Sequence, residues 1–291
     1  MNVHVEKRSE QNRWWGHLDD SPRPGLLDVT QLDQPAPSCP ANPIHLKPMA
    51  SLCRDCRVKG LCLPTGLPVQ DNSCLGTLIG PRMRVRKGAA LFNANDPLTT
   101  LYAVRCGSFK TSLNSAEGQG VVINFWMPGD VLGLDAIATE HHVCDAIALE
   151  DSEVCPVPYH RLQTLAREFP VLQQSLNRLM SREIVREHER VLMLCNLTAE
   201  QRLASFLAGL SRRFVNRGYS AHGFMLRMSR EDMASYLGLR LETVCRSVAR
   251  LRALGIVSLR GRLLEILDMH ALMALAKGGP EAQCNETLKA R

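Results

Sequence analysis

The sequence predicts an α+β protein with an antiparallel β-barrel of the jelly-roll type, then a long helix, then a winged helix-turn-helix. Short strand-like runs separated by glycines fill residues 76–159, and no proline or glycine occurs in residues 171–196. From Met228 onward, the spacing of small, glycine and apolar residues is typical of a helix-turn-helix. We expect a disordered, proline-rich leader at 1–45, a cysteine-rich loop at 46–75, the barrel at 76–169, the long helix at 170–197, the winged helix-turn-helix at 198–279 and a tail at 280–291.

The composition is that of a globular protein with room for two cores, with 291 residues of which 45% are hydrophobic and 22% charged. The N-terminus lacks the apolar stretch of a signal peptide, and no run approaches the roughly 18 apolar residues of a membrane span. We therefore expect a cytoplasmic protein without a membrane partner. Residues 198–277 hold 13 Lys and Arg against 6 Asp and Glu, so this part is the candidate for binding nucleic acid.

The barrel is predicted from four runs that alternate in polarity or are rich in β-branched residues: RMRVRKG, LYAVRCG, VVINFW and EVCPVP. Glycines that suit turns separate them, at Gly80, Gly88, Gly107, Gly118, Gly120, Gly129 and Gly133. This rhythm favours an antiparallel barrel or jelly roll.

The long helix carries an apolar seam with 4-3-4-3 spacing, formed by Met180, Ile184, Val191 and Leu194 and completed by Glu187. Packing against its own barrel is the commoner fate of such a seam, but its length and heptad spacing favour a homodimer interface. Across a two-fold axis, Glu187 would meet its own copy, and like charges in a partly dry site repel. The dimer would therefore be weak.

The helix-turn-helix is predicted to begin at Ser229, which with Asp232 forms a capping-box pattern. Ala234 allows close helix packing, Gly238 makes the turn and Val244 anchors the second helix. Residues 256–259 and 263–266 then alternate around a basic tip, which is typical of a two-stranded wing. A plain helical hairpin is the alternative, and the basic charge and the wing argue for double-stranded DNA.

The second helix presents the side chains that would read DNA. In the major groove, Arg246 can donate two hydrogen bonds to guanine, and Glu242 can accept from cytosine. Thr243 and Arg250 would reach phosphates. The whole polar face comprises Arg240, Glu242, Thr243, Cys245, Arg246 and Arg250.

The cysteines indicate a metal centre. Eleven cysteines in a cytoplasmic chain are poor candidates for a disulfide framework. Cys53, Cys56 and Cys62 form a C-x2-C-x5-C loop, and three thiolates so close can share one centre. A tetrahedral site needs a fourth ligand, which the spacing alone does not identify.

Several segments together resemble the FNR (fumarate and nitrate reduction) regulators of the cyclic-AMP-receptor superfamily. They are the cysteine loop, GDVLGLDAIATEHH, EVCPVP, the long helix, LSRRFVNRGYS and YLGLRLETVCR, and the match spans about residues 50–275. The resemblance implies a cyclic-nucleotide-binding-like barrel and Cys155 as the fourth ligand of an oxygen-labile 4Fe-4S cluster. It also implies that the cluster promotes dimerisation on a palindrome resembling TTGAT and ATCAA halves, in control of anaerobic or microaerobic genes. Glu187 and Ile184 match positions that oppose and favour the family's dimer.

The sequence departs from the cyclic-nucleotide-binding pattern. Leu134 follows Gly133 where the family has an acidic residue for the ribose, and His142 with Val143 replaces the Arg-Ser phosphate clamp. We therefore expect no cyclic-nucleotide ligand.

A second departure lies on the reading helix, where Cys245 stands in place of the family's serine. A thiol of similar size can still touch a thymine methyl group, which is our preferred interpretation, and the alternative is a second redox switch on DNA binding. Residues 116–120 and 212–220 resemble regions that contact RNA polymerase.

The other cysteines, of which Cys39 and Cys74 are the near competitors for ligation, are expected to be ordinary thiols: Cys39, Cys74, Cys106, Cys144, Cys195 and Cys284. Two functional alternatives stay open. One is a DNA-binding regulator with a structural zinc site, and the other is an iron-sulfur redox enzyme. The enzyme is disfavoured because no acid-base or nucleophile constellation accompanies the loop.

Overall fold

The computed structural model describes residues 56–58, 61–63, 78–114 and 120–278. The predicted leader and tail, together with Cys53, Cys39, Cys74 and Cys284, lie outside the described residues. All described residues belong to one compact unit, which runs from Ala41 to Arg291.

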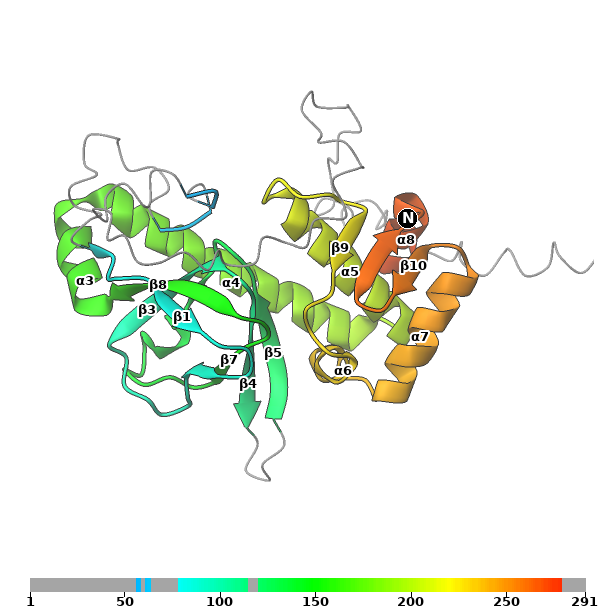
Figure 1. Cartoon of the computed structure of the whole chain (residues 1–291), viewed down its shortest axis with the longest axis horizontal. Coiled ribbons are helices and arrows are strands. Elements are labelled where there is room, and N and C mark those ends of the chain that lie inside the picture. Colours follow the sequence, from blue (N-terminus) through cyan, green and yellow to red (C-terminus); the bar gives the residue numbers. More distant parts are fainter. Residues whose placement is uncertain (1–55, 59–60, 64–77, 115–119, 279–291) are drawn as a thin grey trace, which may run out of the picture. The chain divides into compact units, whose positions relative to one another are not determined.

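The barrel consists of two antiparallel four-stranded sheets (Figure 1), in the strand orders β1-β8-β3-β6 and β2-β7-β4-β5. Its strands are β1 (Met83–Val85), β2 (Ala90–Phe92), β3 (Thr100–Cys106), β4 (Phe109–Asn114), β5 (Gly120–Trp126), β6 (Val131–Leu132), β7 (Asp145–Ala148) and β8 (Ser152–Pro158). A 3-10 turn, η3 (Leu134–Ala136), follows β6. Alternate side chains of both sheets point inward, so residues such as Leu101, Phe109 and Val154 are fully buried.

Two helices leave the barrel, α3 (Tyr159–Glu168) and α4 (Pro170–Asn196). Pro170 occupies the first turn of α4, where its fixed φ suits the helix and its missing N–H is not needed. The first half of α4 buries Leu172, Leu176 and Leu179 against the barrel. The predicted long helix is therefore confirmed, and one face of it packs in the same chain.

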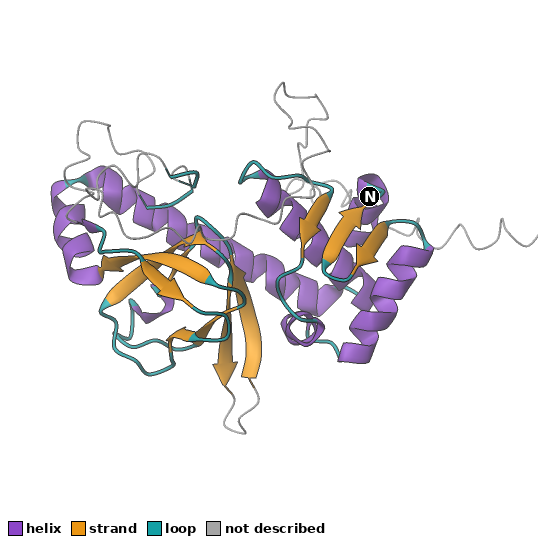
Figure 2. Cartoon of the chain, in the orientation of Figure 1, coloured by secondary structure: helices purple, strands orange, loops and turns teal. Residues whose placement is uncertain are grey.

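The C-terminal part is the predicted winged helix-turn-helix (Figure 2). It contains α5 (Ala199–Val215), β9 (Gly223–Met225), α6 (Arg230–Leu237), α7 (Leu241–Ala253), β10 (Val257–Arg260), β11 (Leu263–Ile266) and α8 (Met269–Ala276). The wing has three strands in the order β10-β11-β9, because the short β9 pairs with β11. The sequence predicted only two, since three residues are too few for a recognisable alternation.

The turn between α6 and α7 forms as the sequence predicts. The hydroxyl of Ser229 accepts a hydrogen bond from the backbone N–H of Asp232, whose carboxylate accepts one from the N–H of Ser229. Gly238 has φ 61° in the left-handed region, which only glycine adopts without strain. Ala234 and Val244 are buried between the two helices.

Candidate functional site

Helix α7 is amphipathic, with its apolar face in the core and its polar face in solvent. Val244 and Leu251 are fully buried. Glu242 and Arg246 are exposed near its N-terminal end. The other predicted reading residues divide into Arg240 and Cys245, which are exposed, and Thr243 and Arg250, which are half-buried. The structure thus places Glu242, Thr243, Cys245 and Arg246 in the first two turns of α7, Arg240 at its N-cap, and Arg250 in its last turn.

The wing tip adds positive charge to the DNA-binding part of the chain. Arg260, Gly261 and Arg262 are exposed, and Gly261 has φ 60° at the turn. A guanidinium nitrogen of Arg262 lies 3.5 Å from the carbonyl oxygen of Arg227. A duplex seated on α7 could therefore meet cationic side chains from the wing.

Arg202 on α5 stabilises the reading unit, by which we mean the helix pair α6 and α7. No sequence pattern predicts this role. Its guanidinium donates hydrogen bonds to the carbonyl oxygens of Leu194, Leu197 and Leu237, at 2.8, 2.9 and 3.1 Å. These carbonyls belong to the C-terminal ends of α4 and α6, where carbonyl groups lack helical partners. One side chain therefore ties both helix ends to α5.

A cysteine-lined pocket lies against the first sheet of the barrel. Cys56, Cys62 and Cys155 share it with apolar side chains that include Val58 and Leu63. Cys155 belongs to β8 and pairs with Ala103 of β3 in the antiparallel register. The pocket thus brings together three of the four predicted ligands, although Cys155 is far from the others in sequence.

The described part of the chain contains no group of three or more His, Cys, Asp or Glu side chains placed to hold a metal ion. The fourth predicted ligand, Cys53, falls outside that part. The expectation of an ordinary thiol at Cys106 is wrong, because this residue is disulfide-bonded in the structure. Cys144 is buried inside the barrel, and burial followed by the charge of Asp135 raises the pKa of its thiol.

His142, which replaces the arginine of the family's phosphate clamp, is buried in the barrel. His142 is 3% exposed and stacks on Phe92, with ring centroids 3.7 Å apart. Its Nδ1 lies 3.5 Å from a carboxylate oxygen of Asp135. A Cβ atom on Gly133 would approach the His142 ring to 3.3 Å, so the space beside this glycine is occupied.

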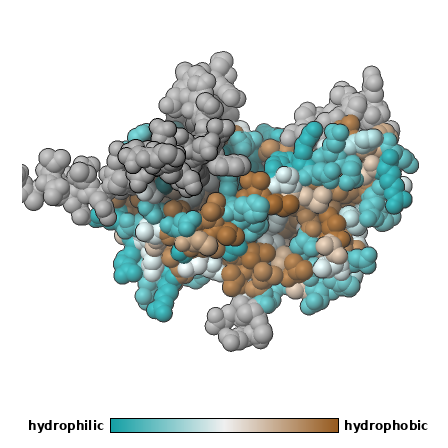
Figure 3. All heavy atoms as spheres, turned by 180° about the vertical axis from the view of Figure 1, so that it is seen from behind, coloured by the Kyte–Doolittle hydropathy of each residue, from teal (hydrophilic) through white to brown (hydrophobic). Residues whose placement is uncertain are grey.

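The second half of α4 leaves an apolar stripe in solvent. Ile184, Val191 and Leu192 are 56%, 55% and 61% exposed. Apolar side chains also gather in the middle of the molecular face drawn in Figure 3. At the edge of the stripe, Glu187 lies 3.7 Å from Arg190 of the same helix. An exposed apolar helix face of this kind is typical of an interface.

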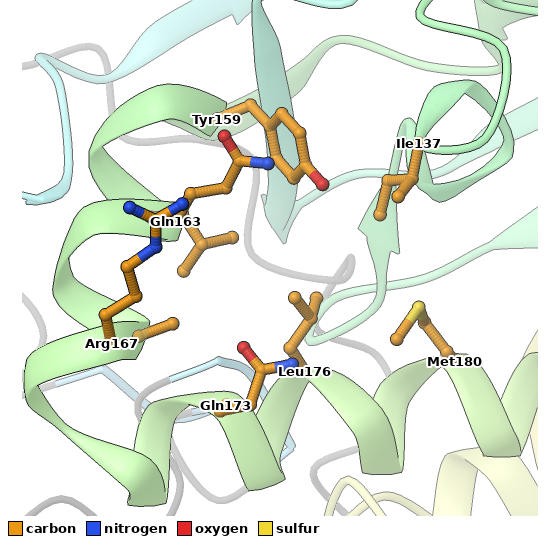
Figure 4. Close-up of a pocket in the computed structure, with 9 residues that line it drawn as sticks. Ile137, Tyr159, Gln163, Arg167, Gln173, Leu176 and Met180 are labelled. Atoms are coloured by element: carbon orange, nitrogen blue, oxygen red, sulfur yellow. The ribbon is translucent and has the colours of Figure 1, made fainter.

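The two ends of the predicted seam pack within the chain. Met180 packs against the barrel core and lines a cavity of about 260 Å³ between α3 and α4 (Figure 4). Leu194 packs against the core of the DNA-binding part, and its Cδ2 would be 3.3 Å from a Cβ on Gly238. Of the seam, the structure therefore leaves Ile184, Glu187 and Val191 exposed.

A buried ionic cluster surrounds Asp130. The carboxylate of Asp130 lies within 3.3, 2.6 and 2.8 Å of guanidinium nitrogens of Arg186, Arg213 and Arg217. Asp130 belongs to the turn after β5, Arg186 to α4, Arg213 to α5, and Arg217 to the turn that follows α5. No local sequence pattern indicates that these four side chains meet.

No helix within the described ranges is long and apolar enough to cross a membrane.

Two family models match the chain: a cyclic nucleotide-binding domain over residues 82–169 and a Crp-like helix-turn-helix domain over residues 201–275. The chain is 40% identical over 232 residues to the transcriptional regulatory protein btr of Bordetella pertussis, which covers 80% of this chain and 96% of that protein. It is 42% identical to the anaerobic regulatory protein of Pasteurella multocida, with 77% and 82% covered. It is 39% identical to the fumarate and nitrate reduction regulatory protein of Salmonella typhimurium, with 77% and 90% covered.

Among solved structures, FixK2 from Bradyrhizobium japonicum has a TM-score of 0.63 and 29% identity, over 68% of this chain and 98% of that one. Both halves of the chain, and relatives matched over most of their length, lead to the same assignment. The chain belongs to the CRP/FNR family, whose members are DNA-binding transcription factors with a helix-turn-helix and are not enzymes.

Proposed function

We propose that the protein is an oxygen-responsive transcription regulator whose 4Fe-4S cluster is held by Cys53, Cys56, Cys62 and Cys155. The observation that carries the proposal is the shared pocket of Cys56, Cys62 and Cys155. Two relatives whose names refer to anaerobic regulation and to fumarate and nitrate reduction support it, as does the identity of about 40%. Cluster loss in oxygen would inactivate the regulator, and its targets would be genes of anaerobic or microaerobic metabolism.

The donor set suits an iron-sulfur cluster. Such clusters are held by cysteine thiolates, and their reduction potentials depend on solvent access and on the charge nearby. The pocket is largely apolar, and the cation that lines it, Arg105, is paired with Glu153 at 2.6 Å. When bound, the cluster supplies the reactivity towards oxygen, while the chain supplies the ligands and the apolar surroundings.

We propose a parallel homodimer in which the exposed stripe of α4 is buried. Ile184 and Val191 would contact their copies, and Met180 would extend the contact towards the barrel. Glu187 would approach its copy and oppose dimerisation, partly offset by Arg190 at 3.7 Å. This balance makes dimerisation weak enough for the state of the cysteine loop to control it.

In the dimer, each α7 would enter the major groove of one half of a palindrome with TTGAT and ATCAA halves. Arg246 and Glu242 would read bases, whereas Arg240, Thr243, Cys245 and Arg250 would contact the backbone or a thymine methyl group. Cyclic nucleotides would have no role, which the buried His142 at the phosphate position supports. We also propose that the protein acts in the cytoplasm.

Contact with RNA polymerase would involve residues 212–220. Val215 and Tyr219 are 47% and 44% exposed, so apolar surface is available there. Of the second predicted contact region, residues 116–120, only Gly120 lies within the described part of the chain.

Purification without oxygen, followed by air exposure, tests the proposal. We expect a brown protein with about four iron atoms per chain. In air, the colour, the dimer fraction and the binding to the palindrome should decline together. Colourless, zinc-containing protein that binds the palindrome equally in air would replace the sensor with a structural zinc site and leave the DNA-binding half intact.

A further inference from the structure

The turn between β5 and β6 contacts both the cysteine loop and the DNA-binding part of the chain. Its residues are Met127, Pro128, Gly129 and Asp130. The N–H of Gly129 donates to the carbonyl of Val104, and the N–H of Val104 donates to the carbonyl of Asp130, at 2.8 and 2.9 Å. The turn is therefore fixed to β3, the strand that also pairs with β8 and Cys155.

On one side, the turn lies directly beneath the cysteine loop. Gly129 has φ 94°, and a Cβ atom there would be 2.9 Å from the Cβ of Leu61 and 3.4 Å from that of Val58. Both residues lie between Cys56 and Cys62. A movement of the cysteine loop would therefore displace the turn between β5 and β6, because close-packed atoms transmit displacement.

On the other side, the Asp130 carboxylate contacts guanidinium groups from α4, from α5 and from the turn that follows α5. Arg213 also donates to the carbonyl of Phe125 at 2.8 Å, and Arg217 donates to the carbonyl of Pro128 at 2.7 Å. Arg186 pairs with Glu183 on its own helix. The cluster thus joins the barrel turn to α4, which carries the exposed stripe, and to α5, which supports the reading unit.

The cluster is sensitive to the loss of any member. Asp130 is 6% exposed, and burial alone would raise the pKa of its carboxyl. Arg213, Arg217 and Arg186 outweigh burial and hold this pKa below its ordinary range. A buried carboxylate that needs several cations keeps them in a defined arrangement, because separation would leave an unpaired buried charge.

We propose that Asp130 is a positioning residue that sets the placement of the DNA-binding part relative to α4, and that the cysteine loop acts on it through Gly129. This inference rests on the proposed binding of a dimer to a palindrome. Two reading helices must lie about 34 Å apart to enter successive major grooves on one face of DNA. A fixed placement of each reading unit therefore selects one half-site spacing.

Fluorescence anisotropy with three palindromes tests the proposal, one with the preferred spacing and two with one base pair added or removed. The variants are Asp130→Asn, Arg186→Met and Leu61→Ala, each purified without oxygen and checked for iron content and thermal unfolding. We expect all three to keep their iron but to bind the preferred palindrome about tenfold more weakly, within the usual range of coupling between sites. Their preference among the three spacings should also shrink.

Lys110→Met is the matched control. Lys110 of β4 pairs with Asp232 of α6 at 2.6 Å, so it also joins the barrel to the DNA-binding part, but it is 24% exposed. This single pair is only partly buried, so its loss should cost much less than disruption of the Asp130 cluster, and we expect affinity and spacing preference close to wild type. If Asp130→Asn does not fold, Arg186→Met decides, since Asp130 keeps Arg213 and Arg217.

The outcomes separate the inference from the proposed function. Wild-type protein that shows no preference among spacings contradicts dimeric palindrome binding itself. Wild-type protein with a clear preference that Arg186→Met retains in full overturns the positioning role of Asp130. A Leu61→Ala variant with wild-type behaviour overturns the action of the loop through Gly129.

Discussion

At the scale of single residues, the reading face of α7 combines an acidic and a basic side chain. Glu242 and Arg246 are both exposed and lie four residues apart, so they project from the same side of the helix. Opposite charges at this spacing can address different base edges in the groove. The identity of both residues is visible in the sequence, and the structure adds that neither supports the core.

Replacing Arg246 by alanine should weaken binding to the palindrome by about 1–3 kcal/mol per half-site and relax the base preference at one position. The folded state should be unaffected because the side chain is exposed. Electrophoretic mobility shifts on single-base variants of the site measure this. Arg84→Ala, which removes an exposed arginine from β1, is the control and should bind as wild type. Equal losses in both variants would indicate a general charge effect.

The ligand role of Cys155 can be separated from that of other thiols in the barrel. Cys155→Ala should abolish the iron-sulfur absorption and the iron content of protein purified without oxygen. Cys144→Ala should retain both, since the Cys144 thiol is buried and its raised pKa disfavours the thiolate. Retention of the cluster in Cys155→Ala would exclude this residue as a ligand.

Only some of the proposed cysteine ligands could be predicted from local sequence. The C-x2-C-x5-C loop is a local pattern, so it was visible directly. Cys155 was identified only through a family resemblance, because the register that sets β8 beside β3 depends on pairing across the barrel. Asp130, Arg213 and Arg217 lie in segments that carry the family resemblance, but nothing in the sequence predicted that they meet, since the three arginines are far along the chain from Asp130.

At the scale of elements, α4 is divided between two tasks. Its N-terminal half is buried against the barrel, and its C-terminal half exposes the apolar stripe. Heptad spacing predicted the helix and its seam, but spacing cannot tell whether a seam residue is covered by its own chain or by a second copy. Met180 and Leu194 turned out to pack in the same chain.

Glu187→Ala should strengthen dimerisation of the cluster-free protein by about tenfold, or about 1.4 kcal/mol. Each copy contributes one Glu187 carboxylate, so the substitution removes both of the carboxylates that repel each other in the dimer. Sedimentation velocity over a range of concentrations measures this. Glu189→Ala is the control on the same helix, where an exposed carboxylate pairs with Arg212 and is not part of the predicted seam. If both variants dimerise as wild type, Glu187 does not lie at the interface.

The α6–α7 turn depends on the conformation of Gly238. Gly238→Ala should lower the free energy of unfolding by about 1–2 kcal/mol, because alanine is strained at φ 61°. The added Cβ would also be 3.3 Å from Leu194. Gly209→Ala is the opposite case, since a Cβ within α5 meets nothing within 4 Å. There alanine should stabilise the helix by about 0.5–1 kcal/mol, and urea unfolding compares the two.

At the scale of the whole molecule, the positive charge is concentrated in the DNA-binding part of the chain. The chain carries a formal charge of +6, yet the DNA-binding part alone has 13 Lys and Arg against 6 Asp and Glu. Several of these arginines are internal, since Arg202, Arg213 and Arg217 bind carbonyl or carboxylate oxygens. Composition correctly indicated a nucleic-acid partner, but it could not distinguish structural arginines from those free to meet phosphate.

The wing arginines should belong to the second group, and the salt dependence of binding tests this. Each phosphate contact contributes about 0.9 to the slope of log K against log salt. Replacing Arg260 and Arg262 by alanine in both copies of a dimer removes up to four contacts, so the slope should become shallower by about 3–4. Replacing the exposed Arg86 and Lys87 of the barrel removes the same charge far from α7 in sequence. That control should keep the wild-type slope. A shallower slope in both double variants would mean that the net charge of the chain, and not the wing, accounts for the salt dependence.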